Sequence, residues 1–101
     1  MSEKYFIYLM SNSRNTVLYI GVSHDIFNRV ESHKNKNIPG FTRKYNCTKL
    51  VYFEEFLSRD EAYRREKKLK GWRRSYKDNL IDNINPDRND LFNDLAMLLS
   101  Q

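Results

Sequence analysis

The chain has 101 residues, of which 40% are hydrophobic and 31% are charged, and its formal net charge is +5. These values indicate a single folded domain over residues 1–101 and exclude a disordered chain or two separate cores. No apolar run approaches the roughly 20 residues of a membrane-spanning helix, and the first residues lack the layout of a signal peptide. The single cysteine, Cys47, forms no internal disulfide, so we expect a protein of the reducing cytoplasm.

A β-hairpin is predicted at the start of the chain. Residues 5–10 and 17–22 are apolar or β-branched runs, and the polar residues 12–15 between them are typical of a turn. If the strands pair symmetrically about the middle of this turn, Tyr8 lies opposite Tyr19, with both hydroxyls on one face of the sheet. A shift of one residue would place the two rings on opposite faces.

A helix is predicted over residues 25–36, capped by Ser23 or Asp25. Arg29 and His33 are four residues apart and therefore share one face of this helix. That face borders the apolar stripe, so we expect both side chains where the helix meets the sheet.

Helices dominate the second half of the chain. Residues 90–99 have leucines at helical spacing, and we expect this helix to close the core in a monomer; the alternative is a weak dimer contact. The predicted elements are a loop over residues 38–47, a strand over 49–56, and helices over 59–72, 73–83 and 90–99, with Ser58 as the cap of the first of these helices.

Glu66 interrupts the apolar stripe of the helix predicted over residues 59–72. On a helical wheel it projects close to Ala62 and Leu69. A carboxylate in such a position is costly unless it is paired or binds a cation. Two interpretations remain open, namely an ion pair with Lys70 one turn later and a ligand for a divalent metal.

Positive charge is concentrated between residues 59 and 77, which contain nine of the 18 Lys and Arg residues and only three acidic residues. Such a segment is typical of a protein that binds a polyanion, although a solvated helix face has the same composition. We expect a nucleic-acid partner, DNA ahead of RNA, and no membrane partner. The residues expected to contact nucleic acid are Lys34, Arg43, Lys44, Lys70 and Arg73.

Five side chains are candidates for a site that cleaves phosphodiester bonds. Hydroxyl and imidazole groups can exchange protons, a guanidinium can bind a phosphate, and a carboxylate can hold a divalent metal. Each side chain also has an ordinary structural role, because tyrosines are frequent in strands and arginine stems cover apolar surface. The candidates are Tyr8, Tyr19, Arg29, His33 and Glu66.

The sequence resembles the GIY-YIG nuclease superfamily, in its small single-domain form, which is similar to the N-terminal nuclease domain of the excision-repair incision subunit. Phe6-Ile7-Tyr8 corresponds to the first signature and Tyr19-Ile20-Gly21 to the second. Phe6 replaces the glycine of the first signature, and Val22 stands where some relatives have a lysine. The resemblance covers about residues 4–92 and leaves 93–101 as a C-terminal helical extension. The other matching segments are residues 25–34, 40–46, 50–56, 61–74 and 85–86.

This resemblance implies an α/β (α+β) fold with a small three-stranded, mainly antiparallel sheet flanked by helices. It also implies an endonuclease that uses one weakly held Mg²⁺ or Mn²⁺. By position, Arg29 would bind the phosphate, Glu66 would be the metal ligand, and Gly21 and Asn85 would support the site. Tyr8, Tyr19 and His33 all remain open as the general base.

The expected function is therefore hydrolysis of nucleic-acid phosphodiester bonds, in repair or processing of DNA. The alternative is a nucleic-acid-binding module of the same fold with weak or absent catalysis. Phe6 and Val22, the two departures from the family pattern, motivate this alternative.

Overall fold

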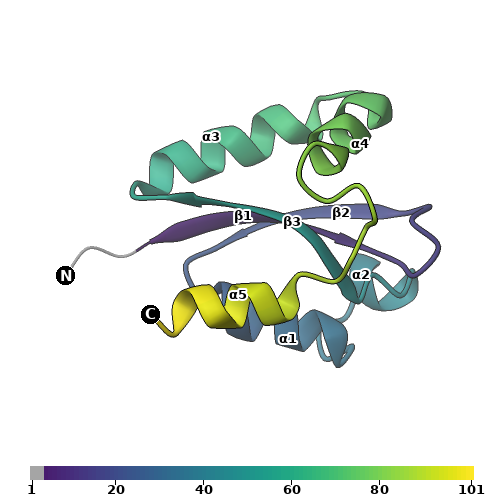
Figure 1. Cartoon of the computed structure of the whole chain (residues 1–101), viewed down its shortest axis with the longest axis horizontal. Coiled ribbons are helices and arrows are strands. Elements are labelled where there is room, and N and C mark those ends of the chain that lie inside the picture. Colours follow the sequence, from purple (N-terminus) through teal and green to yellow (C-terminus); the bar gives the residue numbers. More distant parts are fainter. Residues whose placement is uncertain (1–3) are drawn as a thin grey trace.

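A three-stranded antiparallel sheet lies at the centre of the protein, for which the computed structural model describes residues 4–101 (Figure 1). Its strands are β1 (Tyr5–Ser11), β2 (Leu18–Ser23) and β3 (Lys49–Phe56), in the order β2-β1-β3. β1 is central and is buried along almost its whole length, as its continuous apolar sequence requires. Both strand pairs are antiparallel, which confirms the predicted sheet.

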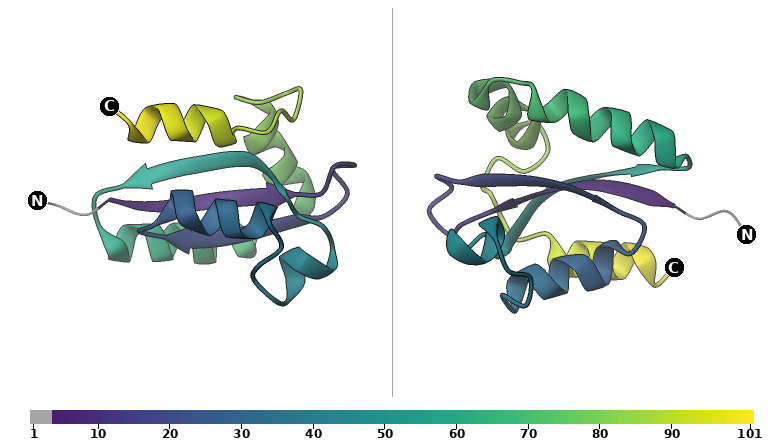
Figure 2. Two further views of the ribbon diagram at one scale, coloured as in Figure 1. Left: turned by 90° about the horizontal axis from the view of Figure 1, so that it is seen from below. Right: turned by 180° about the vertical axis from the view of Figure 1, so that it is seen from behind.

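Helices cover both faces of the sheet, so the molecule has three layers (Figures 1 and 2). One layer contains α1 (Ile26–Lys34), α2 (Phe41–Lys44) and α5 (Phe92–Leu99), and the other contains α3 (Arg59–Lys70) and α4 (Arg74–Asp82). None of the helices within residues 4–101 is long and apolar enough to cross a membrane.

Alternate residues of β1 face two hydrophobic cores, one on each side of the sheet. The expectation of a single core was therefore wrong, because the central sheet divides the buried side chains of the one domain into two clusters. Tyr8 and Met10 are buried among residues of α1 and α5, whereas Ile7 and Leu9 are buried among residues of α3 and α4. Leu95 of α5 is completely buried in the first core, so this helix closes the core, as predicted.

The register of the hairpin differs from the predicted one by two residues. Tyr8 pairs with Gly21, and Tyr19 pairs with Met10. The turn is longer than predicted because the side-chain oxygen of Asn12 accepts hydrogen bonds from the backbone amides of the last two loop residues, at 2.9 and 3.0 Å. A shift of two residues leaves every side chain on its original face, so the predicted common face of the two tyrosines is confirmed.

The other predicted boundaries agree with the structure to within two residues, except in the loop over residues 38–47. The predicted strand over 49–56 is β3, and the hydroxyl of Ser58 accepts a hydrogen bond from the amide of Glu61 at 3.4 Å as the cap of α3. The loop contains the unpredicted short helix α2. Gly40, with φ of 114°, precedes α2, and this backbone conformation favours glycine.

Candidate active site

Tyr8, Tyr19 and His33 form a compact cluster between the sheet and α1. The hydroxyl of Tyr8 lies 2.9 Å from Nε2 of His33, and both residues are almost completely buried. The ring centroids of Tyr8 and Tyr19 are 6.3 Å apart, and the Tyr19 and His33 rings meet edge to face at 5.4 Å. The sheet and α1 therefore bring together the three residues that the sequence left open as a general base.

Gly21 allows the ring of Tyr8 to lie directly on the backbone of β2. A Cβ atom at Gly21 would lie 2.3 Å from Cζ and 2.4 Å from the hydroxyl oxygen of Tyr8. No real Cβ approaches other atoms so closely, so any side chain at this position would displace the ring. Gly21 is thus a packing requirement of the Tyr8 position, consistent with its predicted supporting role.

Thr42 is a fourth member of the cluster, and the sequence did not predict it. Its hydroxyl lies 2.9 Å from Nδ1 of His33, and its side chain is buried. With the proton on Nδ1, His33 donates to Thr42 and accepts from Tyr8; with the proton on Nε2, both roles reverse. Thr42 lies on α2, whose four residues leave no periodic pattern, so no sequence signal pointed to it.

Burial controls the protonation of this cluster. Burial raises the pKa of Tyr8 to about 12, the nearby Tyr19 adds to this increase, and the charge of Arg29 opposes it. Burial lowers the pKa of His33 to about 4, with a further decrease from Arg29. Near neutral pH the Tyr8–His33 pair is therefore uncharged, and both groups hold one shared hydrogen bond.

We expect the folded state to lose stability in mild acid because of His33. The pKa of His33 falls from an ordinary 6.5 to about 4 on folding, so the unfolded chain binds this proton more readily. The stabilisation is complete above pH 6.5 and declines as the pH falls toward 4, by roughly 2–3 kcal/mol at about pH 4.5. Urea unfolding at several pH values measures how the free energy of unfolding changes with pH. Between pH 6.5 and 4 this change should be smaller for His33→Gln than for the wild type.

His24→Gln is the matched control for this measurement, because His24 is exposed. Its stability should follow the wild-type pH dependence over the same range. If the free energy of unfolding changed equally with pH in His33→Gln and in the wild type, His33 would not be buried in its neutral form.

Arg29 and Glu66 approach the cluster from opposite layers of the molecule. Arg29 lies on α1 and Glu66 on α3, yet the charges of both influence the pKa of Tyr8. β2 is an edge strand with one helical layer on each of its faces (Figure 2), and side chains from both layers line a pocket at its outer side. Direct contacts therefore join Tyr8, Tyr19 and His33, whereas Arg29 and Glu66 are linked to them through the effect of their charges on Tyr8. Arg29 lines a separate pocket with Ser23 and Asp25.

The Glu66 carboxylate is compatible with a single, weakly held divalent metal. Its side chain is 17% exposed and forms the alternative interaction predicted from sequence, an ion pair with Lys70 at 3.4 Å. Within residues 4–101, no group of three or more His, Cys, Asp or Glu side chains is arranged to hold a metal. Mg²⁺ is commonly held by one or two carboxylates together with substrate phosphates and water, so a lone glutamate can hold it only when such ligands complete the coordination.

Some of the basic side chains are paired within the protein, whereas others are exposed to solvent. The ammonium of Lys34 contacts the carboxylate of Asp90 and donates to the carbonyl of Thr48 at 3.0 Å, so its charge is compensated. Arg65 forms a bidentate pair with Glu54, at 2.9 Å for both hydrogen bonds. The exposed basic residues among the predicted nucleic-acid contacts are Arg43, Lys44, Lys70 and Arg73.

Asn85 is buried and supports the chain that follows α4. Its amide donates to the carbonyls of Val51 at 3.1 Å and Asn89 at 2.9 Å, and its oxygen accepts from the Asn89 backbone at 3.0 Å. These contacts tie the segment after α4 to β3, on the far side of β1 from β2. The hydrogen bonds of Asn85 thus stabilise the fold and do not involve the Tyr8 cluster.

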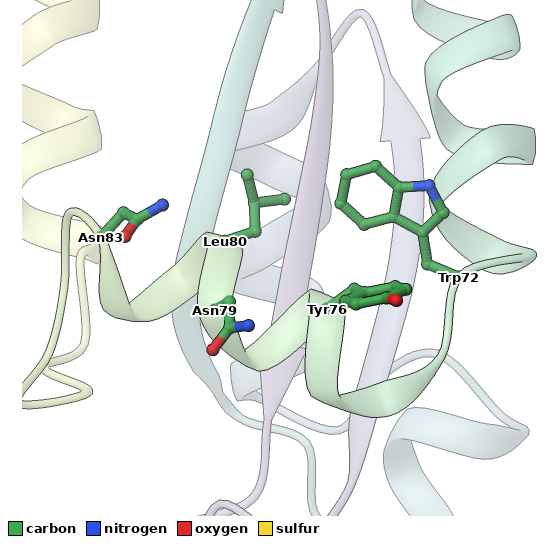
Figure 3. Close-up of a pocket in the computed structure, with 5 residues that line it drawn as sticks. All are labelled: Trp72, Tyr76, Asn79, Leu80 and Asn83. Carbon is green, nitrogen blue, oxygen red and sulfur yellow. The ribbon is translucent and has the colours of Figure 1, made fainter.

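A pocket of about 270 Å³ lies beside the cluster at the edge of β2, and Tyr19, Phe41, Lys70 and Lys77 contribute to its lining. A larger pocket of about 440 Å³ lies elsewhere, between the end of α3 and α4. Figure 3 shows the neutral side chains around this larger pocket, and none of the five predicted site residues lines it. The charged lining of the smaller pocket suits a phosphate-containing substrate better.

The fold and this cluster define a small α/β domain with a candidate active site at one edge of its sheet. Residues 4–79 match the family model of the GIY-YIG catalytic domain. The chain belongs to the GIY-YIG family, whose catalytic domain is of the nuclease type.

The most similar relatives include small bacterial and archaeal proteins. A UPF0213 protein of Staphylococcus saprophyticus is 33% identical over 79 residues, covering 78% of this chain and 95% of that protein. One from Haloquadratum walsbyi is 30% identical over 82 residues, covering 81% and 91%. The solution NMR structure of a UPF0213 protein from Bacillus halodurans has the same fold, with a TM-score of 0.53 and 24% identity over 81% of this chain and 86% of that one.

Phe6 and Val22, the two departures from the family signature, pack in or against the hydrophobic cores. Phe6 is 2% exposed and packs near Phe53, with ring centroids 6.4 Å apart. Val22 packs against the core under α3 and α4, on the sheet face opposite Tyr8. Val22 therefore lies on the other side of the sheet from the Tyr8 ring, whereas Phe6 shares a core with Tyr8.

Proposed function

We propose that the protein is a metal-dependent endonuclease that hydrolyses phosphodiester bonds, with DNA as its substrate in repair or processing. The observation that supports this most is the buried hydrogen bond of 2.9 Å between Tyr8 and His33, packed against Tyr19 and within electrostatic reach of Arg29 and Glu66. In this proposal, groups for proton transfer, phosphate binding and metal binding would act together at one edge of the sheet.

Accessibility favours Tyr19 as the group that accepts a proton from the attacking water. Tyr8 is 1% exposed with a raised pKa, and both ring nitrogens of His33 already have partners. Tyr19 is half-buried and lines the pocket at the edge of β2. The Tyr19 ring would then be positioned by its contacts with Tyr8 and His33, and Thr42 would hold the His33 ring in place.

Arg29 and Glu66 would divide the charge stabilisation between them. The Arg29 guanidinium can neutralise the phosphate that is attacked, through paired hydrogen bonds. Glu66 would hold the divalent metal, which when bound stabilises negative charge on the leaving oxygen. Lys70 must release Glu66 for this, and an ion pair between residues four apart on one helix is worth only a few tenths of a kcal/mol.

The proposal predicts metal-dependent cleavage by the wild-type protein. Supercoiled plasmid, branched DNA and single-stranded DNA should each be incubated with Mg²⁺, Mn²⁺ or EDTA, and the products separated on gels. We expect cleavage with either metal and none with EDTA. If no substrate is cut but binding weakens steeply with salt, the protein is a binding module and the nuclease proposal is wrong.

A further inference from the structure

The pocket at the edge of β2 has an aromatic side and a cationic side. Phe41 of α2 lines it from one layer, and Lys70 of α3 and Lys77 of α4 line it from the other layer. The edge strand β2 lies between them. An aromatic ring facing two ammonium groups is the combination that binds nucleotides, because the ring stacks on the base and the ammonium groups attract the phosphates.

Phe41 is an exposed aromatic ring held in a fixed position. It is 45% exposed, stacks on Tyr19 with ring centroids 6.0 Å apart, and lies 4.7 Å from the ring of Tyr45. Its neighbour Thr42 is anchored to His33, so α2 cannot rotate freely. Lys44 lies over the Tyr45 ring and adds a further positive charge. The rings of Phe41 and Tyr45 form an aromatic platform that is already ordered before a ligand binds. This preorganisation lowers the entropic cost of binding.

We propose that this pocket binds a single unpaired nucleobase of the substrate against Phe41, with the flanking phosphates on Lys70 and Lys77. The inference rests on the proposed nuclease function and names its substrate class, a nucleic acid with an unpaired nucleotide next to the cleaved bond. The pocket adjoins Tyr19, and Lys70 pairs with Glu66, so a nucleotide bound there lies beside the proposed reacting groups.

Duplex nucleic acid cannot use this platform in the same way. In a duplex each base face is covered by its neighbours, so a base must leave the stack before it can lie on an aromatic side chain. The volume of about 270 Å³ is just below the roughly 300–1,000 Å³ of pockets for drug-sized ligands, which suits one ring system. Branched, frayed and single-stranded substrates present such bases, and continuous duplex does not.

The test compares binding of two DNA substrates in EDTA, so that cleavage does not interfere. A short single strand containing 2-aminopurine reports stacking by fluorescence quenching, and its blunt duplex is the comparison. Phe41→Ala should weaken single-strand binding about tenfold and abolish the quenching, while duplex affinity changes less than about twofold. Phe41→Trp should retain single-strand binding, since it keeps an aromatic surface.

Two further variants make the result specific. Tyr63→Ala removes another exposed aromatic ring, one that packs under Arg59 on α3 and is not among the residues lining the pocket, and it should bind both DNAs as the wild type does. Lys77→Gln should lower the salt dependence of single-strand binding by about one ion. The inference is wrong if Phe41→Ala affects both DNAs equally or neither.

The outcomes separate this inference from the nuclease proposal. If the wild type cleaves DNA and Phe41→Ala binds and cuts single strands normally, the nuclease proposal stands and the base pocket does not. If binding depends on Phe41 but no metal supports cleavage, the base pocket stands and the nuclease proposal does not.

Discussion

Replacing Glu66 with glutamine should lower metal-dependent DNA cleavage by about a thousandfold. Glu66 is the carboxylate that lies within electrostatic reach of Tyr8, and no acidic cluster within residues 4–101 can replace it as a metal ligand. Loss of the metal removes several kcal/mol of transition-state stabilisation, and about 4 kcal/mol corresponds to this factor. Initial rates of plasmid nicking at saturating Mg²⁺ or Mn²⁺ measure the effect.

The same variant, Glu66→Gln, should bind DNA at least as tightly as the wild type does. Glutamine removes a negative charge and frees the ammonium of Lys70, which now lies 3.4 Å from the Glu66 carboxylate. DNA affinity in EDTA should therefore stay equal or increase. This result would show that the cleavage defect is not a binding defect.

Glu61→Gln is the matched control for charge and helix position. Glu61 lies in the first turn of the same helix, α3, and is exposed, and its side chain is not a proposed ligand. Its cleavage rate should remain within about twofold of the wild type. Wild-type cleavage by Glu66→Gln would mean that Glu66 does not hold the metal.

The strands and helices could be predicted because their signals are local. The β3 sequence alternates little and is bounded by polar segments, and Ser58 with Glu61 marks the start of α3 directly. The hairpin register could not be fixed in this way. The register depends on the Asn12 side chain. Its oxygen accepts hydrogen bonds from the backbone amides of Thr16 and Val17, and these hydrogen bonds lengthen the turn.

The candidate site was only partly accessible to sequence reasoning. Periodicity could place Tyr8 and Tyr19 on one face of the sheet, and His33 where its helix meets the sheet. Only the structure shows that His33 contacts these two tyrosines. Periodicity contains no information on which layer covers which face of a sheet. It therefore could not indicate that Glu66 approaches from the layer opposite Arg29, or that Thr42 completes the hydrogen bonds of His33.

Gly21→Ala should destabilise the fold by about 3 kcal/mol and also reduce cleavage. The new Cβ would lie 2.3 Å from Cζ of Tyr8, and the ring cannot move easily because its hydroxyl is bonded to His33. Overpacking of a core typically costs 1–3 kcal/mol, and this contact is at the severe end. Thermal unfolding should show a decrease in Tm of roughly 12–24 °C, since about 1 kcal/mol shifts a domain of this size by 4–8 °C.

Gly71→Ala is the matched control, because the chemical change is the same and the surroundings differ. A Cβ at Gly71 would meet only backbone oxygens at 3.5 and 3.9 Å, and its φ of −82° suits alanine. That variant should be as stable as the wild type or slightly more stable.

A double variant locates the cause of the Gly21 effect. In a Tyr8→Leu background the ring is absent, so adding Gly21→Ala should cost less than about 1 kcal/mol. The difference between the two backgrounds measures the conflict between the Cβ and the ring. Equal costs in both backgrounds would mean that β2 itself requires glycine, and that Tyr8 does not impose it.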